Sequence, residues 1–152
     1  MASFLRTRLF HLWFMLRRPM TLGVRALVVN DQGQLLLVKH TYISGWHFPG
    51  GGVERGESAV ESLIRELAEE ANVLLEKEPN LIGFFYNNKT SVRDHVALYL
   101  CEGAIQSAEK DSDREIVAAR FFNLDDLPDD VSPATKRRIN EWRSGSAPAR
   151  FW

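Results

Sequence analysis

The chain has 152 residues, of which 45% are hydrophobic, and a formal net charge of -1 at pH 7. This length predicts one domain with a substantial hydrophobic core, and this composition excludes a disordered chain. A net charge so close to zero gives no overall attraction to nucleic acid or acidic lipid, so we expect no DNA binding.

Residues 1–20 form a basic, aromatic-rich opening. The segment is cationic because it holds four arginines and no acid: Arg6, Arg8, Arg17 and Arg18. Its apolar residues recur at helical spacing and nearly surround the helix that they predict: Phe4, Leu5, Leu9, Phe10, Leu12, Trp13, Phe14 and Leu16. Such a surface is poorly soluble unless covered, so we favour a helix that packs on the domain or on a second subunit in a homodimer. The alternative is a helix that lies on an anionic membrane.

Residues 21–143 predict a single domain of strands and two helices. A hairpin is expected from Thr21 to about Lys39, around a turn at 30–33. Further strands are expected at 80–86, 95–102 and 118–122, and helices beginning at Ser58 and Ser132. Interleaved in this order, these elements predict an α/β fold with a mixed sheet covered on both faces. Residues 144–152 are expected to form a loose tail.

The single cysteine, Cys101, lies in the expected strand at 95–102. One cysteine excludes an intrachain disulfide and favours a reducing compartment, so we expect a cytoplasmic protein. Its apolar neighbours indicate a buried core thiol and not a nucleophile. No apolar run is long enough to span a bilayer.

The most informative stretch is a glycine loop followed by a helix with clustered glutamates. Ser58 and Glu61 match a capping box, which predicts that the helix begins at Ser58. Three glutamates recur three and four residues apart, on a face away from the apolar stripe: Glu66, Glu69 and Glu70. Like charges at this spacing repel by roughly 0.2–0.5 kcal/mol per pair. A hard cation such as Mg²⁺ therefore explains the cluster better than a solvated acidic face does.

The same stretch resembles the Nudix box, the signature of hydrolases that split nucleoside diphosphates linked to a further group. The family's fixed positions fall on Gly51, Glu57, Arg65, Glu66, Leu67, Glu69, Glu70, Asn72 and Val73. Only Asn72 departs, because the family has glycine there. Asparagine also tolerates the left-handed conformation that ends a helix, so we expect little effect. The resemblance covers roughly residues 21–128 and implies the α/β/α sandwich of the Nudix fold.

A metal site follows from this resemblance. The carbonyl of Gly50 and the carboxylates of Glu66, Glu69 and Glu70 map to the family's metal ligands. The resemblance implies Mg²⁺ as the cofactor, with Mn²⁺ as a substitute ion. The expected activity is hydrolysis of a diphosphate bond in a nucleoside diphosphate linked to another group.

The resemblance also implies which residues take part in catalysis. Arg65 and Glu57 map to a pair that braces the loop against the helix. Arg65 is therefore expected in the catalytic centre, where its main role is structural. Glu69 is expected to be the general base. Glu115 stands six residues before Phe121 and is the alternative base, unless it is only a charge on a mobile acidic loop.

Substrate contacts are less sharply defined. Four residues are candidates for contacts to phosphate: Arg25, His40, His47 and Arg93. Trp46 or Tyr86 can stack on a base. For each of these residues, ordinary surface or core placement is the alternative. The spacing of Pro79 and Tyr86 from the box does not match the expected markers of ADP-ribose or dinucleoside polyphosphate enzymes.

Three functions are consistent with the sequence. The first is hydrolysis of a small-molecule nucleotide. The second is the same reaction on the 5′ end of RNA, which requires a basic channel, and the sequence offers only 136–138 and the N-terminal segment for one. The third is a catalytically silent module that binds nucleotide. Such modules typically lose box glutamates, and this chain keeps them all.

Overall fold

The computed structural model describes residues 2–152, and the side chains of residues 7, 8 and 10–152. Its elements follow in chain order: α1 (Ala2–Arg17), β1 (Thr21–Val29), β2 (Leu35–His40), β3 (Trp46–His47), α2 (Ala59–Ala71), β4 (Val73–Leu75), β5 (Asn80–Tyr86), β6 (Asp94–Glu102), β7 (Ala104–Gln106), β8 (Ile116–Phe122) and α3 (Pro133–Ser144). The predicted strands and helices are confirmed, with boundaries that differ by a few residues. Within the described residues, no helix combines the length and apolar character needed to cross a membrane.

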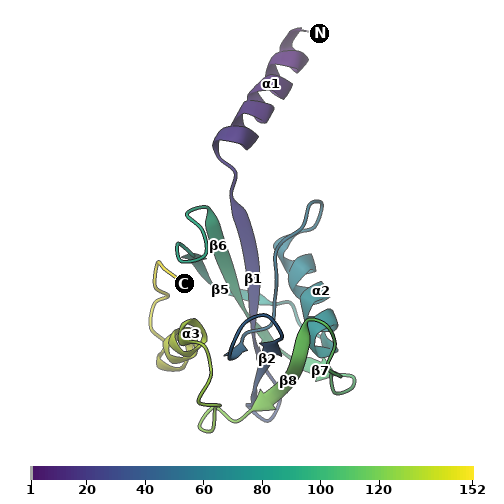
Figure 1. Ribbon diagram of the computed structural model, residues 1–152, viewed down its shortest axis with the longest axis vertical. Coiled ribbons are helices and arrows are strands. Elements are labelled where there is room, and N and C mark those ends of the chain that lie inside the picture. Colours follow the sequence, from purple (N-terminus) through teal and green to yellow (C-terminus); the bar gives the residue numbers. More distant parts are fainter. Residues whose placement is uncertain (1) are drawn as a thin grey trace.

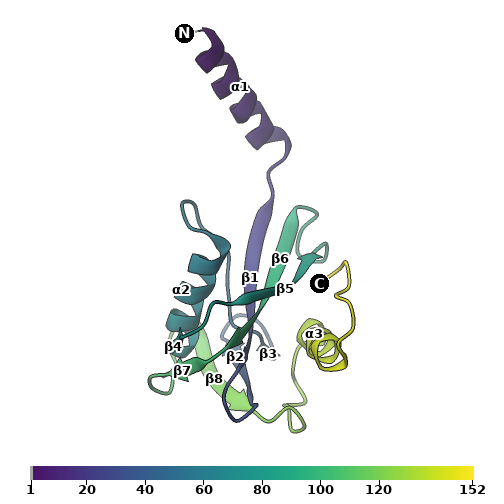
Figure 2. The same cartoon turned by 180° about the vertical axis from the view of Figure 1, so that it is seen from behind.

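The main sheet is mixed, as predicted. Its strand order is β3-β2-β1-β6-β5, and β8 pairs with β2. β1 and β6 are parallel from Thr21↔Asp94 to Val29↔Glu102, whereas the other pairs are antiparallel. α2 lies on one face of the sheet and α3 on the other (Figures 1 and 2). This arrangement confirms the α/β/α sandwich.

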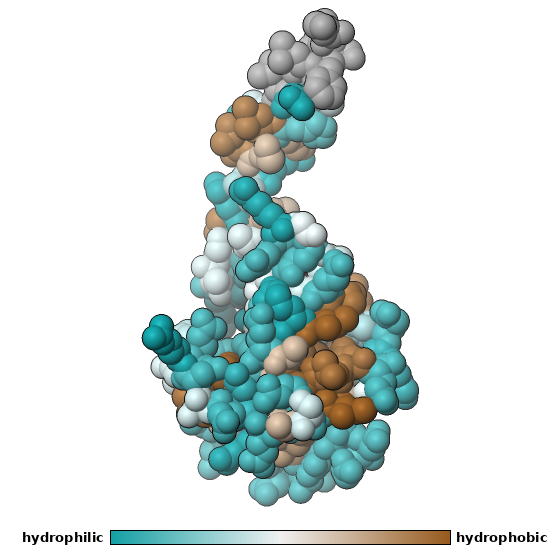
Figure 3. Space-filling view, turned by 90° about the vertical axis from the view of Figure 1, so that its right-hand side faces the viewer, coloured by the Kyte–Doolittle hydropathy of each residue, from teal (hydrophilic) through white to brown (hydrophobic). Residues whose placement is uncertain are grey.

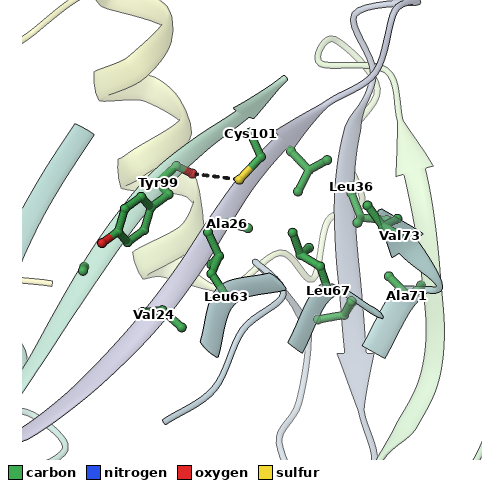
Figure 4. Close-up of a cluster of buried hydrophobic side chains, with 13 residues drawn as sticks. Val24, Ala26, Leu36, Leu63, Leu67, Ala71, Val73, Tyr99 and Cys101 are labelled. Carbon is green, nitrogen blue, oxygen red and sulfur yellow. Dashed lines mark hydrogen bonds between the residues drawn. The ribbon is translucent and has the colours of Figure 1, made fainter. Parts of the chain in front are cut away.

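Alternate side chains of the central strands pack into two separate cores. Leu36 and Val38 of β2 enter the core beneath α2, whereas Leu35 and Leu37 enter the core beneath α3. Leu63 and Leu67 of α2 point into the first core, together with Cys101 from β6 (Figure 4). Full burial of one such side chain stabilises the fold by roughly 1.5–3 kcal/mol. Cys101 is therefore the buried core thiol that the sequence predicts, and burial raises its pKa to about 12.

Both predicted caps of α2 are present. Ser58 Oγ accepts a hydrogen bond from Glu61 N at 3.2 Å, and Glu61 Oε2 accepts one from Ser58 N at 2.7 Å. Asn72 ends the helix in the left-handed conformation, with φ 53°. The departure from the family's glycine is thus accommodated in the way that asparagine allows.

The expectation of a loose C-terminal tail is wrong. Tyr86 N donates to the Arg150 carbonyl at 2.9 Å, and Trp152 N donates to the Tyr86 carbonyl at 3.1 Å. The Trp152 ring packs edge-on against Phe85, with centroids 5.4 Å apart, in the core beneath α3. Buried Arg138 donates to the Phe151 carbonyl at 2.8 Å. The tail is fixed because it supplies an aromatic ring to the core and acceptors to a buried guanidinium.

α1 is helical, as predicted, but it does not fold back onto its own domain. It projects beyond the end of β1 (Figures 1–3), and the side chains of Trp13 and Leu16 are 53% and 74% exposed. Pro19 in the short connection favours an extended backbone and so carries the helix onward from β1. Packing on the same domain is therefore wrong, whereas packing on a second subunit stays a prediction. The side chains of Phe4, Leu5, Arg6 and Leu9 lie outside the described residues.

Candidate active site

The glycine loop runs beside β1 and approaches α2 closely. Val24 N donates to the Gly51 carbonyl at 2.8 Å, so the loop pairs with the first half of β1. Gly50 has φ 136°, and a side chain there would collide with the Val24 carbonyl. A side chain at Gly51 would collide with the Glu66 carboxylate. Glycine at position 50 therefore lets the loop pack closely on β1, and glycine at position 51 leaves room for the Glu66 carboxylate of α2.

The three glutamates of α2 occupy different environments. Glu70 is buried and accepts a hydrogen bond from Gly50 N at 2.7 Å. Glu66 is half-buried against the glycine loop and accepts from Arg65 Nη1 at 2.9 Å. Glu69 is the most exposed of the three, and Arg65 Nη1 reaches it at 3.3 Å. The helix therefore encloses Glu66 and Glu70 beneath the glycine loop and presents only Glu69 to solvent.

Arg65 joins the loop to the helix. It donates to both carboxylate oxygens of Glu57, at 3.2 and 3.0 Å, and Nη2 lies 3.4 Å from the Gly52 carbonyl. These hydrogen bonds hold the pKa of Glu57 down to about 2, with help from the backbone N–H of Glu54. The geometry supports the bracing role inferred from the resemblance. It also puts Arg65 in contact with two of the three clustered glutamates.

Glu115 faces the same glutamates from the opposite wall. A hollow of about 330 Å³ is lined by Glu66, Glu69, Glu70, Asp113, Arg114, Glu115 and Ile116. We call it the acidic hollow. Asp113 Oδ1 accepts from the backbone N–H groups of Glu115 and Ile116, at 2.9 and 2.8 Å. Thr41 N donates to the Glu115 carbonyl at 2.9 Å.

The loop that carries Glu115 is thus hydrogen-bonded on both sides. The pKa of Asp113 is held well below its usual range by Lys110 and by the same backbone N–H groups. In the sequence, Asp113 stands out only as one of the charges of the acidic loop before Glu115. Its position shortly before a strand, with a side chain able to accept from following N–H groups, was the signal for this organising role.

Burial dominates the electrostatics at Glu70. It raises the pKa of this carboxyl to about 7, against the opposing effects of the Gly50 N–H and of Arg25. His40 Nε2 lies 3.5 Å from Glu70 Oε1, and burial lowers the pKa of His40 to about 4. A ring with this pKa is neutral at pH 7, so the contact is not an ion pair there. Glu70 is therefore a buried acid without an adjacent fixed positive charge.

The acidic hollow offers the donors that a hard divalent cation requires. Its carboxylates supply oxygen ligands, which suit Mg²⁺ or Mn²⁺. A cation would also offset the cost of burying Glu70 in its charged form. As the described side chains stand, no three His, Cys, Asp or Glu residues converge on one point. Glu66 and Glu69 are hydrogen-bonded to Arg65, and Gly50 contacts Glu70 through its N–H, so these groups must turn before they can bind an ion together.

A second hollow lies on the α3 side of this region. It has a volume of about 420 Å³, and its lining includes Arg25, His47, Lys89, Arg137 and Trp152. We call it the basic hollow. The His47 ring centroid lies 6.2 Å from that of His40, which contacts Glu70. Two neighbouring histidines thus lie between the hollows. Arg25, which lines the basic hollow, opposes the effect of burial on the pKa of Glu70.

The other predicted substrate contacts are placed differently. Trp46 is only 8% exposed and packs edge-on against Phe122 at 4.8 Å, which is the core placement that the sequence left open. A ring buried in this way presents little surface on which a base could stack. Tyr86 donates to the Val92 carbonyl at 3.2 Å, and its backbone holds the tail. Arg93 lines neither hollow. Lys89, Arg137 and Trp152 line the basic hollow as well, and no sequence pattern singled them out, because only the docked tail and the turn after β5 bring them together.

Comparisons with known proteins agree with this architecture. The NUDIX domain model matches residues 19–142. The chain is 32% identical over 129 residues to a Bacillus subtilis (strain 168) protein provisionally named 8-oxo-dGTP diphosphatase, and the match covers 83% of this chain and 82% of that protein. It is 40% identical to the RNA pyrophosphohydrolase of Psychrobacter cryohalolentis, but only over 51 residues, 34% of this chain and 30% of that protein.

A solved structure gives the same result. The MutT NUDIX hydrolase from Burkholderia pseudomallei matches with a TM-score of 0.67 and 26% identity, covering 79% of this chain and 95% of that one. The family model spans most of the chain, and the Bacillus subtilis relative matches most of both proteins. This chain therefore belongs to the Nudix family, as a MutT-like hydrolase that cleaves acid anhydride bonds in phosphorus-containing compounds.

Proposed function

We propose that the protein is a Mg²⁺-dependent hydrolase that cleaves a diphosphate bond in a small-molecule nucleotide, with Mn²⁺ as a substitute ion. The observation that carries the proposal is the acidic hollow, in which Glu66, Glu69 and Glu70 of α2 face Glu115. Four carboxylates around one opening repel each other and any phosphate. The arrangement makes physical sense for binding a diphosphate only when a divalent cation lies between them.

Glu66, Glu69, Glu70 and the carbonyl of Gly50 are the proposed ligands. When bound, the ion would neutralise charge on the diphosphate oxygens and make a water molecule easier to deprotonate. The protein itself holds the proposed ligands in position. The glycine loop reaches Glu70 through the Gly50 N–H at 2.7 Å, and Arg65 holds that loop against α2.

We propose Glu69 as the general base. It is the most exposed carboxylate of the cluster, so it can reach a water molecule that attacks from solvent, whereas Glu70 is buried. Glu115 is the alternative, since it is exposed on the facing wall. A base must lie within hydrogen-bond reach of the attacking water, which the exposed pair satisfies more readily than Glu70.

Nucleoside triphosphates are the first substrates to test, with 8-oxo-dGTP among them. This choice rests on the name of the Bacillus subtilis relative, whose match covers most of both chains. The RNA 5′ end is the second candidate, supported by a relative that matches only 34% of this chain. A silent binding module is the third, although every box glutamate is present.

The test is a hydrolysis screen with Mg²⁺, with Mn²⁺ and with chelator. Its substrates are 8-oxo-dGTP, the common nucleoside triphosphates, nucleotide sugars, dinucleotides and a 5′-triphosphorylated RNA. We expect metal-dependent release of pyrophosphate or phosphate from a small nucleotide. Turnover of the RNA alone would favour the second candidate. Nucleotide binding without turnover of any compound would favour the silent module.

We further propose that α1 makes an intermolecular contact in a cytoplasmic protein. A helix that is apolar on most sides is normally buried, and α1 does not contact its own domain closely enough to bury Trp13 or Leu16. A second subunit in a homodimer is our first candidate, and an anionic membrane is the alternative. The cytoplasm is favoured because the only cysteine is a buried thiol.

A further inference from the structure

The flank of α2 that faces away from the acidic hollow borders an exposed apolar surface. The large hydrophobic side chains on it are each 40–56% exposed: Ile64, Leu74, Leu81, Phe84 and Ile105. We call these residues the edge patch. Figure 3 shows apolar side chains gathered in a patch beside α2 on this side of the domain. Contiguous apolar surface of this kind is typical of interaction sites.

Strand register places the members of the edge patch on one face. Leu74 of β4 and Ile105 of β7 are directly opposite each other in an antiparallel pair, so their side chains lie on the same side. Leu81 and Phe84 of β5 pair with residues of β6 that are two positions apart and belong to the core beneath α2. Leu81 and Phe84 therefore lie on the α2 face of the sheet, at its edge.

The α2 face of the sheet has room for a second helix. α2 packs on β1 and β8, whereas β5 ends the strand order two strands beyond β1. Neighbouring strands lie about 4.8 Å apart, and packed helices about 8–10 Å apart. A helix beside α2 would therefore cover β5 and the edge patch. On the α2 side of that gap, Ile64 precedes Glu66 by two positions, which turns it away from the acidic hollow.

α1 has the dimensions and the apolar surface that this position requires. Its 16 residues make a helix about 24 Å long, and the seven residues of β5 span about 23 Å. Its described side chains include large apolar ones that are 50–74% exposed: Phe10, Leu12, Trp13, Met15 and Leu16. The chain thus leaves two apolar surfaces open to solvent, and burying one against the other is favourable.

The charges of the two surfaces are complementary. Arg17 and Arg18 at the end of α1 are exposed, and residues 1–20 include no acid. Exposed Glu61 lies one helical turn before the α2 member of the edge patch, and exposed Glu76 follows β4. Lys77 adjoins Glu76 and offsets part of this negative charge. Opposite charges at the rim of an interface favour encounter and fix orientation.

The geometry points to α1 of a second copy of this chain as the occupant of the edge patch, with each copy placing its helix on the other. For the same chain to do this, the three residues after Arg17 would have to reverse its direction and carry it across two strands. Pro19 instead directs α1 onward from β1 (Figures 1 and 2). This docking surface rests on the intermolecular contact of α1 proposed above and specifies its partner.

The oligomeric state tests the docking surface. Light scattering over a range of protein concentrations compares the intact wild-type chain with Leu74→Lys and Leu81→Lys. Each variant replaces an interface leucine by a cation that the arginines of α1 repel, so the dissociation constant of the dimer should rise at least about tenfold. Val117→Lys is the matched control, because Val117 is similarly exposed but lies on β8, which pairs with β2 on the other side of β1. It should dimerise like the wild type.

Crosslinking identifies the two surfaces directly. One chain carries Leu16→Cys and another carries Leu81→Cys, and a bifunctional maleimide is added after the two are mixed. Native Cys101 is buried and so does not react. We expect more crosslinked dimer from the mixture than from either variant alone. In a chain with both substitutions, a crosslinked product of monomer mass would show that α1 folds back onto its own domain and would overturn the exchange between copies.

The outcomes separate the docking surface from the other proposals. A wild-type monomer at every concentration would overturn it, and salt-sensitive binding of that monomer to anionic vesicles would assign α1 to a membrane. If deletion of residues 1–18 abolishes the dimer while Leu74→Lys and Leu81→Lys leave it intact, with melting temperatures equal to that of the wild type, α1 binds elsewhere and the edge patch is wrong. Turnover by Leu81→Lys should equal that of the wild type, so failure of the hydrolase proposal is measured independently of docking.

Discussion

Glu70 is the residue at which burial and charge compete most directly. Its carboxylate is enclosed beneath the glycine loop, where one N–H and the more distant Arg25 oppose the cost of desolvation. Glu69, one position before it, is largely exposed and meets only Arg65 at 3.3 Å. Glu69 and Glu70, adjacent in one helix, thus differ in burial. Substitutions at the two positions should therefore differ more in their effect on melting temperature than in their effect on turnover.

Glu69→Gln and Glu70→Gln are each expected to lower turnover by at least about a hundredfold, because each removes a charge from the proposed ion site at constant side-chain size. Without metal, Glu70→Gln should melt no lower than the wild type, since it removes a buried charge and keeps an acceptor for the Gly50 N–H. Activity and melting curves are measured with Mg²⁺ and with chelator. Glu76→Gln, in the exposed segment after β4, serves as the control. Full activity in both site variants would exclude the proposed ion site.

At the scale of elements, the glycine loop and α2 behave as one unit because Arg65 holds them together through Glu57. The tail and α3 form a second such unit, in which Arg138 and Trp152 connect the helix to residues beyond its end. Both units depend on an arginine with several acceptors, which is the geometry in which a guanidinium contributes most. Each unit shapes one of the two hollows.

The loop and helix unit should loosen in acid. The pKa of Glu57 falls to about 2 in the folded protein, from 4.5 without the contact, because Arg65 stabilises the charged form. Its stabilising contribution is therefore complete above pH 4.5 and is lost as the pH falls toward 2. Melting temperatures across this range should decline less steeply in Glu57→Gln than in the wild type. If melting temperature fell equally with pH in both proteins, the contact between Glu57 and Arg65 would not contribute to the stability of the fold.

The tail should contribute measurably to stability. Trp152→Ala is expected to lower the free energy of unfolding by about 2–3 kcal/mol, somewhat less than a fully buried tryptophan, because the ring is half-buried against Phe85. Phe151→Ala is the matched control. Its ring is 52% exposed, so its cost should stay below about 1 kcal/mol. Both values come from urea unfolding, and equal losses would mean that the tail is not anchored by Trp152.

The whole molecule divides its charge between two parts. Residues 1–20 carry four arginines and no acid, so residues 21–152 carry a net charge of -5 in a chain of net charge -1. α1 stands away from the domain, and most of its described aromatic and aliphatic side chains are exposed (Figure 3). The hydrolase core and the projecting helix are therefore expected to act independently.

Deleting residues 1–18 is expected to leave turnover unchanged, because neither hollow includes α1. If α1 covers a second subunit, light scattering should show a dimer for the intact chain and a monomer for the deletion. Flotation with anionic vesicles distinguishes the alternative. Salt-sensitive vesicle binding by an intact monomer, lost on deletion, would contradict the homodimer in favour of the membrane.

The sandwich and the acidic helix could be predicted from the residues alone. Strand and helix periodicity, the capping box at Ser58 and the left-handed Asn72 are local, so their physics is contained in neighbouring residues. The box spacing likewise predicts that Glu66, Glu69 and Glu70 share a region of one helix surface. Which of them is buried is not a local property, because it depends on how closely the glycine loop approaches.

Other features depend on contacts between residues that are far apart in the chain. Trp46 and Trp152 both pack in the core beneath α3. No strand or helix pattern in the residues around either tryptophan predicts this placement. Arg25, Lys89 and Arg137 come from β1, the turn after β5 and α3, and no spacing rule connects them. Their meeting depends on long-range packing of the sheet, α3 and the tail. For α1 the sequence predicted a helix. Its separation from the domain depends on the direction that the connection at Pro19 gives to the chain.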